Sequence, residues 1–240
     1  MSEYTPHFAP FVVVAFLGTG FVLVVCVLTA ILGWLYNSRR VALTGTASLL
    51  SVVTLYTGVL LALSLSSQEV VLPAGSWKYF CEIDCHIADS VAAVVTGQRI
   101  GPETQQVVSD GKFVIVQIKT WFDAATISSQ RGNGPLTPNG RTAFLYDAAG
   151  HRYGISPKAE AVLAATGTYS MPLRTALRPG ESYMSYLVFE VPAGAGDLHL
   201  LLSSADEVNV LLWGHEQSPF HKKILLALDS PKRLSFPGSL

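Results

Sequence analysis

The sequence opens with two long stretches that contain no charged side chain. They cover residues 9–37 and 41–68, and Arg39 and Arg40 are the only charges near the point where they meet. A helix needs roughly 20 apolar residues to cross a hydrocarbon core about 30 Å thick, so each stretch is long enough to span. The sequence therefore predicts a transmembrane hairpin, with helices at 11–36 and 42–66 and a turn at 37–41.

The basic turn also predicts how the hairpin is oriented. Lys and Arg in short loops stay on the cytoplasmic side, so Arg39 and Arg40 place the turn inside. Residues 1–10 and the domain at 67–240 are then extracytoplasmic, in the periplasm if the cell is Gram-negative. Residues 1–10 contain no Lys or Arg, and no small-x-small cleavage site follows the first stretch, so we interpret it as a retained span of the inner membrane rather than a signal peptide.

The second predicted helix carries small and hydroxyl side chains along one face. Such a face lets another helix approach closely. The residues on it are Ser48, Ser51, Thr54 and Gly58. Two interpretations stay open, because this face can pack on the first helix or on a helix of a partner subunit. Neither span holds an ionisable residue, which argues against an ion or proton pathway.

Composition narrows the class of partner. Apolar residues make up 50% of the chain, and the two spans explain much of this excess. The formal net charge is −1. No basic surface suggests a nucleic-acid partner. Neither a phosphate-binding loop nor a serine-hydrolase elbow occurs. We expect no enzyme activity, no cofactor and no small-molecule substrate.

After residue 69 the pattern changes from apolar runs to short alternating segments. Alternation of apolar and polar side chains indicates half-buried strands, and it is clearest over 77–87. The other predicted strands are 90–95, 113–122, 142–146, 183–191, 198–202 and 208–213, and 158–165 is the one predicted helix. Short strands separated by Gly- and Pro-rich turns are typical of an all-β, antiparallel sandwich of immunoglobulin type.

One motif in this domain resembles a known family. A Leu-Arg-Pro-Gly-Glu-Ser-Tyr segment at 177–183 leads into Leu-Val-Phe-Glu-Val-Pro at 187–192. This resembles bacterial membrane-anchored immunoglobulin-like domains of unknown function, in which a Pro-Gly-Glu turn precedes a strand that ends in Phe-x-Val-Pro. The resemblance covers roughly residues 70–228. It implies a β-sandwich tethered outside the membrane, and it brings no activity or site with it.

The most distinctive chemical motif is Cys81-x-x-x-Cys85-His86. It is one residue longer than the c-type haem attachment motif, and an outer β domain on two spans resembles the copper-bearing subunit of respiratory oxidases. In an extended strand, however, Cys81 and Cys85 lie about 13 Å apart. That is too far for one metal, one haem or a disulfide. We therefore predict two buried free thiols, with an electron-transfer or metal-carrying role as the alternative.

Two other groups of polar residues could hold a metal ion. Glu82, Asp84 and His86 alternate along the predicted strand, about 6.6 Å apart, so neighbouring members share a face. A solvated polar face explains them equally well. His215, Glu216 and His221 do not have the spacing of a His-Glu-x-x-His zinc helix, and Pro219 interrupts a helix there.

These patterns together favour a non-catalytic, membrane-anchored protein. We expect an accessory subunit of a larger membrane complex, for instance respiratory or photosynthetic, whose partners are the lipid bilayer and other membrane-protein subunits. Two spans, one with a hydroxyl-rich face, exceed what anchoring alone requires.

Overall fold

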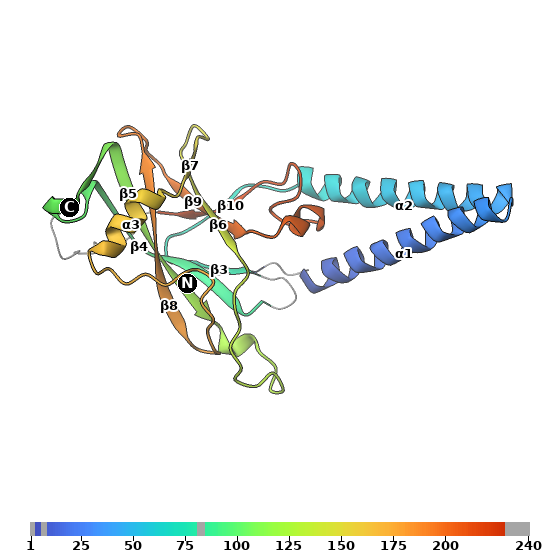
Figure 1. The fold of residues 1–240 in the computed structure, drawn as a ribbon, viewed down its shortest axis with the longest axis horizontal. Helices are drawn as coiled ribbons and strands as arrows, with labels where there is room; N and C mark the ends of the chain where they lie inside the picture. Colours follow the sequence, from blue (N-terminus) through green and yellow to red (C-terminus); the bar gives the residue numbers. More distant parts are fainter. Residues whose placement is uncertain (1–2, 6–8, 81–84, 229–240) are drawn as a thin grey trace.

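The computed structural model describes residues 3–5, 9–80 and 85–228. Two long helices, α1 (Ala9–Leu35) and α2 (Arg39–Leu65), form the arm that extends from the β domain in Figure 1. Both are long and apolar enough to cross a membrane. They are joined by a short turn in which Asn37 adopts a left-handed conformation with a φ of 51°, which Asn tolerates better than most residues.

Glycines allow the two helices to approach closely near that turn. A Cβ atom on Gly33 would lie 2.3 Å from the backbone nitrogen of Ala42, and one on Gly45 would lie 2.5 Å from that of Ala30. Small residues at such points let two backbones pack against each other. In Figure 1 the helices are close at this end and separate toward the β domain.

The rest of the chain forms two five-stranded sheets. The order of the first sheet is β1 (Glu3–Tyr4), β3 (Trp77–Phe80), β4 (Ile87–Ile100), β5 (Val107–Phe122) and β8 (Ser182–Val191). The order of the second is β2 (Val70–Leu72), β10 (Ile224–Ala227), β9 (His199–Ser204), β6 (Arg141–Tyr146) and β7 (Arg152–Gly154).

Both sheets are mixed, so the prediction of a purely antiparallel sandwich is wrong. β1 runs parallel to β3, and β2 runs parallel to β10, whereas the other strand pairs are antiparallel. Parallel neighbours need long connections. Here the helical hairpin separates β1 from β3, and nearly the whole β domain separates β2 from β10. The immunoglobulin-type topology is not confirmed.

The main core lies between the two sheets. Alternate residues of β5, namely Val114, Val116 and Ile118, face it and meet Phe189 and Leu200. The intervening residues of the same strand lie on its opposite face, where α3 (Pro157–Ala165) covers them. Phe113, Ile115, Ala159 and Leu163 form this second cluster. β5 is therefore buried on both faces over this stretch, which explains its nearly continuous apolar sequence.

Two strand predictions are wrong and have clear physical reasons. The predicted strand 77–87 ends at Phe80, which pairs with Ile87 in an antiparallel hairpin, so the chain reverses between them. The predicted strand 208–213 is instead the 3₁₀ helix η3 (Glu207–Leu211) and the residues after it. Its aliphatic residues are not arranged for a sheet, because this segment packs against α2. The predicted helix and the strands within β4, β5, β6, β8 and β9 are present.

Candidate functional site

The β domain is mounted on α2 by residues 205–223, which connect β9 to β10. We name these residues the helix-facing segment. The hydroxyl of Tyr56, in α2, donates a hydrogen bond to the carbonyl oxygen of Leu211 at 2.7 Å. The indole of Trp213 donates to the carbonyl of Tyr56 at 3.3 Å, and the two rings lie 4.9 Å apart. Aromatic rings at this distance and tilt attract each other as well as burying apolar area.

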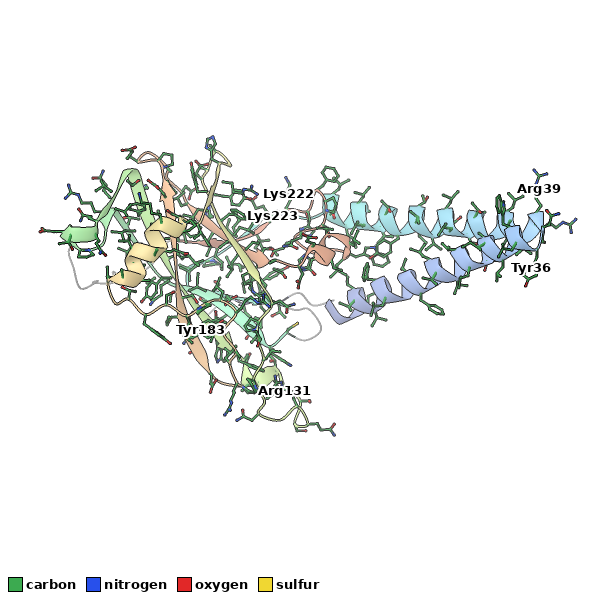
Figure 2. All side chains as sticks on the ribbon, viewed as in Figure 1. Tyr36, Arg39, Arg131, Tyr183, Lys222 and Lys223 are labelled. Atoms are coloured by element: carbon green, nitrogen blue, oxygen red, sulfur yellow. The ribbon has the colours of Figure 1, made fainter. Side chains whose placement is uncertain are left out.

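A second set of hydrogen bonds fixes the far end of the helix-facing segment. The backbone N–H of Lys222 donates to the hydroxyl oxygen of Ser67 at 2.8 Å, and Ser67 donates to the carbonyl of Ser64 at 2.6 Å. Val70 then donates to the carbonyl of Lys223, where β2 joins β10. Figure 2 shows Lys222 and Lys223 beside the domain end of α2, far from Arg39 at the other end. The segment therefore contacts α2 at Tyr56 and the chain just beyond α2 at Ser67.

Internal hydrogen bonds hold the helix-facing segment in one conformation. The hydroxyl of Ser218 donates to the carbonyl of Leu212 at 2.5 Å, and the side-chain amide of Gln217 donates to the carbonyl of Ser204. The backbone N–H of Gln217 donates to Nδ1 of His215 at 3.1 Å, which requires that nitrogen to be unprotonated. Burial lowers the pKa of His215 to about 4, so the ring is neutral at physiological pH.

A buried ion pair links this segment to the first sheet. Lys78, on β3, is only 2% exposed. Its ammonium lies 3.0 and 2.8 Å from the two carboxylate oxygens of Glu216. It also donates to the carbonyls of Leu202 at 2.7 Å and Ile224 at 3.1 Å. Burial lowers the pKa of Lys78, and the Glu216 carboxylate opposes that shift. A buried ammonium with these partners is well compensated.

A second ion pair lies in the same region. Arg141 on β6 is 3.4 Å from the carboxylate of Asp89 on β4, and Thr120 donates to the same carboxylate at 2.6 Å. Burial raises the pKa of Asp89, against the opposing effect of Arg141 and Thr120. The Phe80 ring lies under both cations, 3.8 Å from the Arg141 guanidinium and 5.4 Å from the Lys78 ammonium.

We name Lys78, Asp89, Arg141 and Glu216 the buried charge cluster. Its hydrogen bonds run between strands of the two sheets and, through Glu216, to the helix-facing segment. Every charged group of the cluster has an opposite charge beside it. The ionised groups satisfy one another, and their contacts hold the two sheets and the helix-facing segment together.

A separate cleft of about 200 Å³ lies between the sheets, away from the cluster. β4, β5, the loop before β9 and the end of β10 line it. Lys112 lines it and donates to the carbonyl of Ala195 at 2.6 Å, and His199 and Leu228 also line it. We assign no chemistry to this cleft.

The predicted cysteine and metal motif is not arranged as expected. Cys81, Glu82 and Asp84 lie outside the described residues. Cys85 is in a disulfide, so the prediction that it is a free thiol is wrong. The distance that argued against a disulfide assumed one continuous strand over 77–87, whereas β3 ends at Phe80 and pairs antiparallel with β4 from Ile87. Over the described part of the chain no group of three His, Cys, Asp or Glu residues is placed to hold a metal ion.

His86 contacts two side chains of the β domain. Its Nδ1 lies 2.7 Å from the hydroxyl of Thr126, and its ring stacks on Phe122 with centroids 5.6 Å apart. His86 precedes β4 directly, and it is not part of an extended strand through 77–87. The predicted strand face of Glu82, Asp84 and His86 therefore does not include His86, and the other two residues lie outside the described residues.

The four residues of the predicted small-residue face of the second helix all lie on its exposed surface. They are Ser48, Ser51, Thr54 and Gly58. A Cβ atom on Gly58 would have no neighbour within 4 Å. Packing on α1 instead uses the Gly45 side of α2. The face therefore does not pack against α1, which was one of the two interpretations given above. The other, a partner helix, stays a prediction.

Sequence reasoning missed the buried charge cluster and the contact of residues 205–223 with α2. Lys78 alternates with Trp77 and Tyr79, and that pattern predicts a solvated lysine. Its partner Glu216 lies 138 residues further along the chain. A charged residue within an otherwise apolar strand is a weak signal, and it identifies no partner.

Comparisons with known proteins give similarity of fold only. No family model matches the sequence, and no curated protein matches it. The structure is similar to that of a conserved hypothetical protein from Bacillus anthracis, with 17% identity and a TM-score of 0.38 over 49% of this chain and 82% of that chain. It is also similar to the yjhA protein from Bacillus subtilis, with 14% identity and a TM-score of 0.38 over 65% of this chain and 98% of that chain. Similarity at this level assigns no activity.

Proposed function

We propose that the protein is a non-catalytic, membrane-anchored accessory subunit of a larger membrane complex. In this proposal α1 and α2 span the inner membrane, the turn that precedes Arg39 and Arg40 is cytoplasmic, and the β domain is extracytoplasmic. The partners are the lipid bilayer and helices of other subunits. A respiratory or photosynthetic assembly is an example of such a complex.

The observation that carries the proposal is the fixed mounting of the β domain on α2. Only residues 66–69 separate α2 from β2, and the contacts of Tyr56 with Leu211 and Trp213 hold the domain against the helix at a second point. A simple tether needs no such contact, because a flexible linker suffices to keep a binding domain near a surface. A domain held at a defined position and angle suits a part of an assembly.

The exposed small-residue face of α2 supports the second half of the proposal. Hydroxyl and glycine residues on an exposed helix face gain van der Waals contacts and interhelical hydrogen bonds when another helix meets them. Because Ser51 and Gly58 are exposed in the chain by itself, a partner helix can reach them without displacing α1.

We also propose that the β domain is a member of the bacterial membrane-anchored immunoglobulin-like domains. The support is the motif at 177–192, in which the turn at Gly180 leads directly into β8. Gly180 has a φ of +85°, the positive value expected of a glycine in such a turn.

The experiment that tests the assembly replaces Ser51 and Gly58 together with Leu. We expect the variant to be lost from the complex isolated in mild detergent, while the β domain melts at the temperature of the wild type. The matched control replaces Thr46 and Thr57 with Leu, because these hydroxyl residues are exposed on another part of the same helix. If both double variants copurify with the same proteins as the wild type, the small-residue face is not the interface.

A further inference from the structure

Exposed apolar side chains gather on the helix-facing segment. The exposed fractions of Val208 and Phe220 are 55% and 73%, and Val210 and Leu211 are exposed as well. Elsewhere in the described part of the β domain, the large exposed hydrophobic residues are Val70 and Val71, which follow α2 closely, and Val108 and Tyr169. The apolar surface of the domain is thus concentrated beside the end of α2.

The contact with Tyr56 determines how deep this segment lies. The uncharged run of α2 begins at Val41, and 20 residues at 1.5 Å per residue cover a hydrocarbon core about 30 Å thick, ending near residue 61. Tyr56 lies five residues before that point, which is about 7.5 Å along the helix axis. Leu211 and Trp213, which Tyr56 contacts, are then at that depth. Apolar elements that lie within a membrane interface typically enter it by about 5–10 Å.

Two backbone carbonyls of the segment are satisfied in a way that such a depth requires, although the buried side-chain Nδ2 of Asn209 has no hydrogen-bond partner among the described residues. Unpaired backbone carbonyls are costly in hydrocarbon. The carbonyl of Leu211 accepts from the Tyr56 hydroxyl, and that of Leu212 accepts from Ser218. At the start of the segment, Asp206 is held by the side-chain amide of Asn139 on the domain side, at 2.8 Å.

The aromatic pair lies on the hydrocarbon side of the membrane interface, and the basic residue lies on the headgroup side. Tyr and Trp are enriched where hydrocarbon meets water, and the Tyr56–Trp213 pair is such a pair. Lys222, which is exposed, follows the apolar tip at Phe220, and its backbone is bonded to Ser67 just beyond the end of α2. A lysine there has its ammonium beside the phosphates of anionic lipids, to which basic residues are attracted.

We propose that the helix-facing segment is a lipid-binding wedge. Val208, Leu211 and Phe220 insert into the outer leaflet of the bilayer beside α2, and Lys222 contacts the headgroups. This inference rests on the proposed function, because the depth is measured along a spanning α2. The wedge would fix the β domain at a set height above the membrane.

The test uses the full chain with Cys26→Ala, which removes the free cysteine of the first helix. Nitroxide labels are attached to Val208→Cys or Phe220→Cys, and the protein is placed in vesicles of phosphatidylethanolamine and phosphatidylglycerol. Collisions with oxygen, which concentrates in lipid, are compared with collisions with a water-soluble nickel chelate. The matched control is Val108→Cys, because Val108 has a similar exposed fraction of 60% on β5. The unlabelled parent gives the background.

We expect the labels at 208 and 220 to shift toward oxygen accessibility, and the label at 108 to stay accessible to the chelate. Labels at 208 and 220 that behave like the label at 108 would overturn the inference. Loss of both kinds of collision would also overturn it, because protein and not lipid would then cover the segment.

A fourth label separates this inference from the proposal on which it rests. Leu55 is exposed on α2 one residue before Tyr56. If a label at Leu55→Cys is in lipid but those at 208 and 220 are in water, the wedge is wrong and the span stands. If the label at 55 is in water, the spanning hairpin itself fails.

Discussion

Replacing Glu216 with Gln tests the buried charge cluster most sharply. The substitution keeps the size and a hydrogen-bonding oxygen but removes the negative charge 2.8 Å from the Lys78 ammonium. Lys78 is 2% exposed, so water cannot replace the lost carboxylate, and the carbonyls of Leu202 and Ile224 remain as its partners. Removing one member of a buried ion pair costs about 3–5 kcal/mol of stability.

That cost corresponds to a large change in melting temperature. For a domain of this size, each kcal/mol shifts the melting temperature by about 2–4 °C, so we expect a decrease of roughly 6–20 °C. The assay is thermal unfolding of the full chain in mild detergent at pH 7, followed by circular dichroism. The matched control is Glu207→Gln, an exposed glutamate on the same segment that should change the melting temperature little.

The stability lost in Glu216→Gln should also depend on pH, and the pKa of Lys78 determines whether the loss grows or shrinks. Burial lowers the pKa of the Lys78 ammonium below its ordinary value near 10.5, and removing Glu216 lowers that pKa further. At a pH between the folded and the unfolded pKa of Lys78, the unfolded chain binds more protons than the folded one, so stability increases with pH. The difference between Glu216→Gln and the wild type should therefore shrink as pH rises from 7 toward 10.

Adding Lys78→Met to Glu216→Gln should restore part of the lost stability, because no uncompensated charge is then buried. The reasoning fails if Glu216→Gln melts at the temperature of Glu207→Gln. It also fails if the double variant loses as much stability as the two single variants added together, because Lys78 and Glu216 would then act independently.

Three further predictions concern the turn, the buried histidine and the topology. Gly180→Ala should cost about 1–2 kcal/mol, because its φ of +85° is unfavourable for a residue with a Cβ, whereas Gly194→Ala, with open space and no positive φ, should cost little in the same melting assay. Because the pKa of His215 in the folded protein is about 4, below its unfolded value near 6.5, stability should fall as pH decreases from 6.5 to 4, by up to about 3 kcal/mol, and His215→Asn should lose this pH dependence. A cysteine at Gly132 should react with a membrane-impermeant reagent in cells whose outer membrane has been opened, and one at Ser38 should be protected; the reverse pattern would contradict the orientation.

The helices and the central strands could be predicted because their signals are local. The absence of charge over 9–37 and 41–68 requires long apolar helices, whatever the rest of the chain does. β5 and β8 lie where apolar residues and turn residues such as Gly180 predict them. These elements depend on neighbours within a few residues, and periodicity reports them directly.

The site depends on contacts that are distant in sequence, and periodicity does not report those. The alternation around Lys78 predicts a solvated lysine, but the helix-facing segment covers it from 138 residues away. Residues 208–213 have the composition of a strand, yet they meet α2 through Tyr56 and form η3. The expectation for Cys85 failed because the strand spacing used for it does not hold where Phe80 pairs with Ile87.

The central claim is that the chain works as part of a larger membrane assembly. Its most direct test is the composition of the particle that contains the wild-type chain, isolated in gentle detergent from the membranes of the cells that make it. Native mass measurement should find this chain together with other membrane proteins in a fixed ratio. A monomeric particle under conditions that keep known membrane complexes intact would contradict the claim, and a simple tethered binding domain would then be the better account.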